Sequence, residues 1–252
     1  MKAGPALLFF VLLAVPVQAA QSGHDLYVAG KYDEALRLGA ASNNAADLVF
    51  AARAGLAEAG MKPCAACVAQ ALGFAQRAVA ADPDMADAHT ILAIAIGQQA
   101  RRDGLVLARL HNAPARARHE LDVALRLEPQ NPLALAALGG WNIEVVRAGG
   151  VKLAHWLYGA SLQAGLGDFA QAFRREPGNV ALRYQYALSL SGFDPVTYHS
   201  EILGALETAV KSAPQTAYEK IAQARSAELL DLLKRGDKAA YAVQVRKYQG
   251  YP

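Results

Sequence analysis

The most informative pattern of hydrophobic and polar positions recurs four times along the chain. Each copy is a nine-residue segment with proline at its end, alanine five residues before the proline and an apolar side chain eight residues before it. The copies are Ala75–Pro83, Leu121–Pro129, Phe169–Pro177 and Leu206–Pro214. Two apolar positions three residues apart share one face of an α-helix, and proline ends a helix because it lacks an N–H group. Each segment therefore predicts the end of a helix that packs closely through its alanine.

A new helix is expected after each of these prolines. A short polar or glycine-containing turn follows, and then a segment with helical apolar periodicity, over residues 85–100, 132–147, 180–190 and 216–233. Residues that favour strands are scattered and form no alternating runs. The chain is therefore predicted to be all-α, with helix-turn-helix units in tandem that form a superhelical solenoid.

The alanine-x4-proline ending of these units resembles the tetratricopeptide repeat (TPR) family. Ala93 and Gly139 match the small residue that the family places inside its first helix, and Gly30–Leu36 is similar to its inter-helix turn. The resemblance implies one repeat domain over residues 21–252, with about five to six helix pairs.

Successive prolines are separated by 46, 48 and 37 residues, which departs from the family consensus of about 34. Longer helices or insertions account for the difference. Insertions are predicted at residues 102–114 and 148–167, the second with a short extra helix over residues 151–163.

The N-terminus has the pattern of a secretory signal over residues 1–20. Lys2 precedes an apolar run at residues 6–15, and cleavage is expected after Ala19 or Ala20. An uncleaved anchor is the alternative, but about 10 apolar residues are too few for a spanning helix of roughly 20. We therefore expect export and no transmembrane segment after removal of the signal. The lack of an Asn-x-Ser/Thr sequon favours a bacterial periplasm.

Composition and motifs argue against several classes of function. The chain is 54% hydrophobic with a formal charge of +3 and contains no dense basic run, which argues against nucleic-acid binding. The six histidines are dispersed, and neither a Gly-x-Ser-x-Gly motif nor a glycine-rich phosphate loop is present. We therefore expect no enzymatic activity, no cofactor and no metal.

Cys64 and Cys67 form the one chemically suggestive pair. In an oxidising compartment, two cysteines one helical turn apart can form a structural disulfide, which is the favoured interpretation. A thiol-redox role is the alternative, because a helix N-terminus can activate the first thiol, although the chain lacks the βαβ pattern that usually accompanies that chemistry. Zinc binding lacks the further ligands that it needs.

The TPR resemblance also implies where a partner would bind, because first helices line the concave face of such arrays. The family's groove positions fall on Thr90, Ile94, Gln98, Ala136, Gly140, Glu144, Tyr184 and Leu188, and Arg147 continues the same face. The predicted partner-binding residues are Gln98, Glu144, Arg147 and Tyr184. Five aromatic residues could together form a binding patch, but burial in the core is the favoured interpretation of them. They are Trp141, Trp156, Tyr158, Tyr184 and Tyr186.

These patterns together predict a periplasmic scaffold or adaptor that binds a protein or peptide in its concave groove and catalyses nothing. A thiol-redox helper and an accessory protein that binds a small ligand or a polysaccharide fragment are the alternatives.

Overall fold

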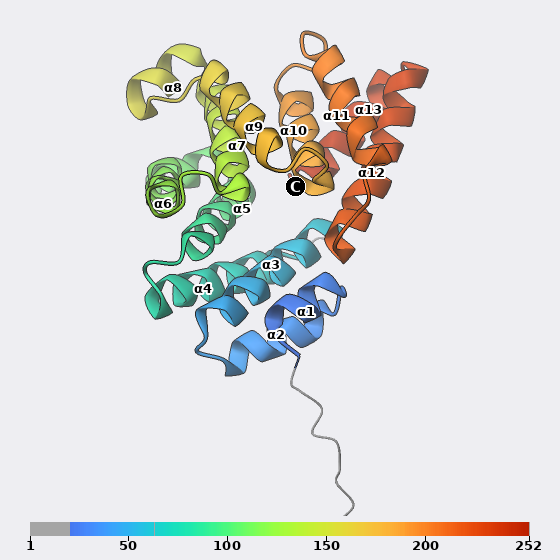
Figure 1. The fold of residues 1–252 in the computed structure, drawn as a ribbon. Helices are drawn as coiled ribbons and strands as arrows, with labels where there is room; N and C mark the ends of the chain where they lie inside the picture. Colours follow the sequence, from blue (N-terminus) through green and yellow to red (C-terminus); the bar gives the residue numbers. More distant parts are fainter. Residues whose placement is uncertain (1–20, 63, 252) are drawn as a thin grey trace, which may run out of the picture.

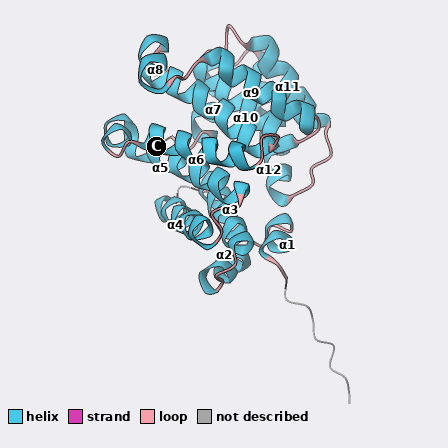
Figure 2. Cartoon of the chain, turned by 60° about the vertical axis from the view of Figure 1, so that its left-hand side comes forward, coloured by secondary structure: helices cyan, strands magenta, loops and turns pink. Residues whose placement is uncertain are grey.

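The computed structural model describes residues 21–62 and 64–251, and each regular element within them is a helix (Figures 1 and 2). The predicted all-α, repeat-like fold class is thereby confirmed. The thirteen helices in this part of the chain are α1 (Gly23–Val28), α2 (Tyr32–Ala41), α3 (Ala45–Met61), α4 (Ala65–Ala81), α5 (Ala86–Leu110), α6 (Ala113–Leu127), α7 (Pro132–Gly149), α8 (Val151–Tyr158), α9 (Leu162–Arg175), α10 (Val180–Phe193), α11 (His199–Lys211), α12 (Ala217–Arg235) and α13 (Lys238–Tyr248).

The four prolines end helices as predicted. Helices α4, α6, α9 and α11 each stop two or three residues before the proline of their segment. The repeated alanines are completely buried, at 0% exposure for Ala78, Ala124, Ala172 and Ala209. Helices α7 and α10 then start from asparagine caps, because Asn131 and Asn179 each accept a hydrogen bond from the amide three residues later.

Glycine allows a close contact between the two helices of the α7–α9 pair. A Cβ atom on Gly139 of α7 would lie 2.7 Å from Phe169 Cδ2 and 2.9 Å from the carbonyl oxygen of Gly165, both in α9. A side chain at position 139 would therefore push the two helices apart. This is the physical reason for the small residue that the sequence pattern detects there.

The two predicted insertions are more helical than expected. Residues 102–114 continue α5 to Leu110 across a break at Gly104, where φ is 79°, and α6 begins at Ala113. In the second insertion the extra helix exists, but it stops at Tyr158 and not at residue 163. Gly159 ends it in a left-handed conformation with φ of 66°, and Ser161 caps the start of α9.

The array of helix pairs curls until its two ends meet. Helix α12 lies beside α1 and α3 at the end of the arc, where Arg225 Nη2 donates to the carbonyl oxygen of Gly60 at 2.7 Å. Gly30 approaches so closely that a Cβ on it would lie 2.7 Å from Ala217 Cβ. The C-terminal residues return into the middle of the arc (Figure 1). The concave face is thus enclosed on several sides.

The predicted signal segment, residues 1–20, lies outside the described residues. Among the helices that the structure does describe, none combines the length and apolarity required to cross a bilayer.

Candidate binding site

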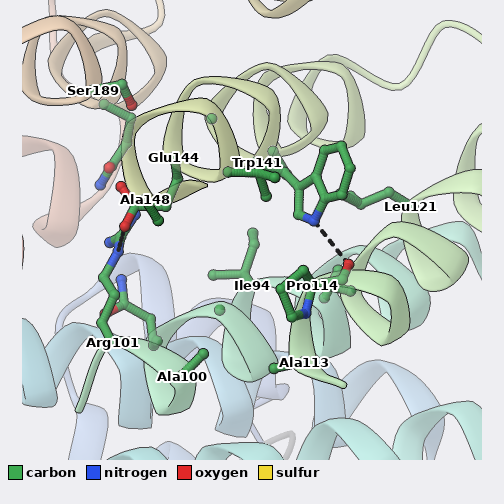
Figure 3. Close-up of a pocket in the computed structure, with 18 of the residues that line it drawn as sticks. Ile94, Ala100, Arg101, Ala113, Pro114, Leu121, Trp141, Glu144, Ala148 and Ser189 are labelled. Carbon is green, nitrogen blue, oxygen red and sulfur yellow. Dashed lines mark hydrogen bonds and ion pairs between the residues drawn. The ribbon is translucent and has the colours of Figure 1, made fainter. Parts of the chain in front are cut away.

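A cavity of about 590 Å³ opens on the concave face of the array (Figure 3). Its walls come mainly from α5, α6 and α7, and α3, α8, α9, α10 and α12 also contribute side chains. Ile94 lies between a charged end at Arg101 and Glu144 and an aromatic end at Trp141. The site therefore joins elements that are far apart in the sequence.

The aromatic end of the cavity is apolar and well packed. Trp141 is 9% exposed, and its Nε1 donates to the carbonyl oxygen of Pro114 at 2.9 Å. Tyr158 of α8 meets the Trp141 ring edge-on, with 6.5 Å between the ring centroids. Leu121 and Val145 complete the wall. The short helix α8 thus places an aromatic ring over this end of the cavity.

The lining of the cavity carries an excess of positive charge. Four arginines and one glutamate line the cavity, and the arginines are Arg53, Arg101, Arg109 and Arg147. Arg147 binds both carboxylate oxygens of Glu144, with Nε at 3.0 Å and Nη2 at 2.7 Å, and Arg101 Nε lies 4.0 Å from the same group. The single glutamate leaves most of this positive charge uncompensated.

Glu144 stays ionised in this setting. Burial alone would raise the pKa of Glu144, but the hydrogen bond from Arg147 and the charges of Arg101 and Arg147 exceed that effect, so the net pKa is lowered. The hydrogen bond that Arg147 donates to Glu144 in turn raises the pKa of Arg147. A carboxylate held this firmly by arginine is a poor general acid or base at neutral pH.

Three of the four predicted partner-binding residues line this cavity. Gln98, Glu144 and Arg147 do so, together with the predicted groove residues Ile94, Ala136 and Gly140. Tyr184 does not, because its side chain is 1% exposed and packs in the core around α10, α11 and α12. Burial in the core, the favoured interpretation of the aromatic residues, therefore applies to Tyr184, whereas Trp156 is 79% exposed.

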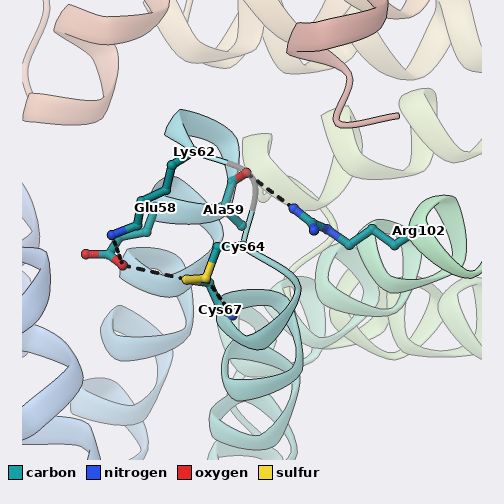
Figure 4. The surroundings of a disulfide bond; sticks show 6 residues. All are labelled: Glu58, Ala59, Lys62, Cys64, Cys67 and Arg102. Atoms are coloured by element: carbon teal, nitrogen blue, oxygen red, sulfur yellow. Dashed lines mark hydrogen bonds and ion pairs between the residues drawn. A yellow bond between two sulfur atoms is a disulfide. The ribbon is translucent and has the colours of Figure 1, made fainter. Parts of the chain in front are cut away.

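The cysteine pair lies away from the cavity, at the junction of α3 and α4 (Figure 4). Cys64 and Cys67 are joined by a disulfide, and Cys64 Sγ also accepts the amide N–H of Cys67 at the start of α4. The carboxylate of Glu58 lies 3.7 Å from Cys67 Sγ and is paired with Lys62 at 3.3 Å. A carboxylate next to the sulfur disfavours a thiolate there.

Sequence reasoning missed two polar contacts. The side chain of His89 is buried between Glu120 Oε2, 2.6 Å from Nδ1, and the carbonyl oxygen of Pro83, 2.9 Å from Nε2, so it joins α5 both to α6 and to the turn before α5. Tyr251, near the end of the chain, contacts Glu144 and Arg147. The two contacts join residues 31 and 107 positions apart, and no local pattern signals such a pair.

Among the described residues, no group of three or more histidine, cysteine or acidic side chains is arranged to hold a metal ion.

Comparison with models of known protein families shows the family to which this chain belongs. A family described as regulator of microtubule dynamics protein 1-3 matches residues 39–234, which is well over half of the chain. The chain belongs to this family. The match spans α3 to α11 completely and includes nearly the whole wall of the cavity. No curated protein matches the chain in sequence.

The family assignment corrects the resemblance to tetratricopeptide repeats, which was wrong. The chain is matched as a regulator of microtubule dynamics protein and not as a member of the TPR family. The alanine and proline positions report how two helices pack and where one ends, and that packing is not confined to one family. The proline separations of 46, 48 and 37 residues already departed from the TPR period.

Proposed function

We propose that the protein is a non-enzymatic binding protein whose concave cavity takes up an apolar peptide segment of a partner protein. The observation that carries the proposal is the cavity itself, of about 590 Å³, with an aromatic end and an excess of arginine in its lining. Ligand sites in proteins usually measure about 300 to 1,000 Å³ and combine apolar walls with a few placed polar groups. The volume suits a few side chains of a peptide.

The excess of arginine in the cavity lining supports a partner segment that carries an acidic group. Arg53, Arg101 and Arg109 line the cavity, while its single glutamate is already bound to Arg147. An acidic group in the ligand would gain charge-assisted hydrogen bonds with these arginines. Arginine and aromatic residues are also the side chains that contribute most to binding energy at interfaces.

The paired state of Glu144 supports binding over catalysis. Its lowered pKa keeps it ionised, and its oxygens already accept hydrogen bonds from Arg147 and Tyr251.

The family description names a regulator, and we take from it only a regulatory binding role. Export to a periplasm remains part of the proposal on the evidence of the N-terminal sequence alone, and N-terminal sequencing of the protein from its producing cell would test it.

A dye titration tests the cavity with a defined probe. Anilinonaphthalene sulfonate combines apolar rings with one negative charge, and we expect it to bind saturably at one site. A Cβ on Gly97, which lines the cavity, would have no atom within 4 Å, so a side chain can start there and Gly97→Leu should occupy part of the cavity. Gly73 in α4 is equally open but lies outside the cavity, so Gly73→Leu is the matched control.

We expect Gly97→Leu to weaken dye binding by at least about tenfold, which corresponds to about 1.4 kcal/mol, and Gly73→Leu to leave it unchanged. Equal dye affinity of the two variants and the unaltered chain would overturn the cavity as the binding site.

A thiol-redox role is the second candidate, and one contact favours it. Cys64 Sγ lies at the N-terminus of α4 and accepts the amide N–H of Cys67. Amide groups at a helix start stabilise a thiolate. A measured thiol-exchange activity that Cys64→Ser abolishes would support this role and contradict a purely structural disulfide.

A further inference from the structure

The last residues of the chain already occupy one side of the concave face. After α13 ends at Tyr248, the residues Gln249, Gly250 and Tyr251 cross the middle of the arc. They contact α5, α7 and α10, which precede them by some 60 to 150 residues. This segment shows which chemistry the face accepts.

Gln249 fits a notch on α10 that is formed by a glycine. Its side chain is buried at 9% exposure, and its Nε2 donates to the carbonyl oxygen of Leu188 at 2.9 Å. A Cβ on Gly192 would lie 2.1 Å from this Nε2. Any side chain at position 192 would therefore displace the amide group at the end of the Gln249 side chain.

Gly250 turns the segment toward the cavity. Its φ is +78°, a left-handed conformation that favours glycine over every other residue. It also passes close to α5, because a Cβ on it would lie 3.5 Å from Gln98 Oε1. Arg101 Nη1 donates to the carbonyl oxygen of Gln249 at 3.4 Å and holds the same stretch of backbone.

Tyr251 ends the segment on the charged pair of the cavity. Its hydroxyl contacts Glu144 and Arg147, and the Arg147 guanidinium lies 5.1 Å from the centre of the ring. Burial first, and the charge of Glu144 second, raise the pKa of Tyr251 to about 12, so the hydroxyl keeps its proton and donates to Glu144. The predicted partner-binding residues Gln98, Glu144 and Arg147 all adjoin this segment.

We propose that this face, formed by Gly192, Leu188, Arg101, Glu144 and Arg147, recognises a glutamine, a glycine and an aromatic residue in succession. The chain's own Gln249-Gly250-Tyr251 occupies it here, and a partner peptide of the same type must displace that segment. The inference rests on the proposed function and adds a Gln-Gly-aromatic segment, which binds beside the cavity, to the apolar and acidic segment proposed for the cavity itself. A segment tethered to its site has an effective concentration in the millimolar range, so it competes strongly with an outside peptide.

Displacement requires little unfolding. The segment follows the last turn of α13, and three backbone–backbone hydrogen bonds run from the amides of residues 249–251 to Val245, Lys247 and Arg246, beside the contacts with α5, α7 and α10 described above. Local opening of such a short segment costs less free energy than global unfolding.

The first arm of the test releases residues 249–251 by a substitution on α10, outside the segment itself. Gly192→Ala places a methyl group where the Gln249 amide lies, whereas Gly204→Ala in α11 meets no atom within 4 Å and is the matched control. Alanine is the better helix former in both cases. By hydrogen exchange and mass spectrometry, we expect the amides of residues 249–251 to exchange at least about tenfold faster in Gly192→Ala only. Unchanged exchange in Gly192→Ala, with its helix content intact, would contradict the notch.

The second arm offers the segment in trans. A fluorescein-labelled peptide with the sequence of residues 246–252 is titrated against the full chain carrying Gln249→Ala and Tyr251→Ala, which removes the two side chains that occupy the face. We expect saturable binding that is at least about tenfold weaker to the unaltered chain, because its own segment competes. Adding Gly192→Ala to the double variant should abolish binding, as should Gln→Ala and Tyr→Ala changes in the peptide.

Absence of binding to a folded double variant, or equal binding to all proteins, would overturn the inference. The dye experiment separates the two proposals. If dye binding depends on position 97 but the peptide does not bind, only the assignment of the peptide class fails. If the peptide binds but Gly97→Leu leaves dye binding unchanged, the cavity fails while the face occupied by residues 249–251 stands.

Discussion

At the scale of single residues, the smallest side chains decide how the helices fit. Ala124 and Ala172 are 0% exposed, and Gly139 lies against Phe169 and Gly165. Protein interiors are packed as densely as organic crystals, so one added carbon at such a point must displace a neighbour. The repeated alanine is informative in the sequence for this reason.

Replacing a repeated alanine by leucine should overpack the helix contact. We expect Ala172→Leu to lower the free energy of unfolding by about 1 to 3 kcal/mol. Ala170 lies in the same helix but is exposed, so Ala170→Leu is the control and should change stability little. Chemical denaturation of both variants measures the difference. Equal stabilities would show that position 172 has room that its burial does not suggest.

Asp168 should make stability depend on pH. Burial raises its pKa to about 6, against the opposing hydrogen bond from Asn142 and the charge of Arg118. The unfolded chain loses this proton near the ordinary value of 3.8, so the stability contributed by the neutral form is present below about pH 4 and is lost as pH rises through about 6.

Asp168→Asn stays neutral and can still accept the hydrogen bond from Asn142. At pH 7 we expect the variant to be more stable than the unaltered chain by about 1 kcal/mol, after allowing for solvent screening of a half-buried group. The gain should vanish at pH 4. Urea denaturation at both pH values measures it, and a difference that does not vary with pH would assign the effect to packing.

At the scale of helices, the sequence predicted the helix ends and starts that are determined by residues within one turn. The prolines and the Asn131 and Asn179 caps act within one turn, so the ends of α4, α6 and α9 and the starts of α7 and α10 could be predicted. The helical structure of residues 102–114 could not be predicted, because α5 resumes after Gly104 through its contacts with α6. Propensity alone treats that glycine as a stop.

The disulfide at the start of α4 should stabilise the protein only modestly. A loop of four residues removes little entropy from the unfolded chain, so replacing both Cys64 and Cys67 by serine should cost no more than about 2 kcal/mol. Thermal unfolding of the double variant under oxidising conditions measures this cost. Complete loss of folding would show that the α3–α4 junction depends on the bond far more than the loop length implies.

At the scale of the whole molecule, the closed arc produces the candidate site. Helices α5 and α7 carry Gln98, Glu144 and Arg147 at positions that the repeat register predicted, and these residues do line the cavity. The arginine excess, the placement of α8 over Trp141 and the return of Tyr251 depend on contacts between distant residues. A helical pattern carries no information about such contacts. For the same reason it did not predict that Tyr184 is buried in the core.

Site-specific photocrosslinking tests most directly whether the concave cavity binds a partner. Benzoylphenylalanine replaces Leu105, which lines the cavity and is 55% exposed, or Val243, which is 66% exposed and lies outside the cavity, in cells that make the protein. We predict a light-dependent adduct at position 105 with a defined apolar and acidic peptide of one partner protein, and none with that peptide at position 243. Adducts of the same peptide at both positions, or at position 243 alone, would contradict a binding site in the cavity.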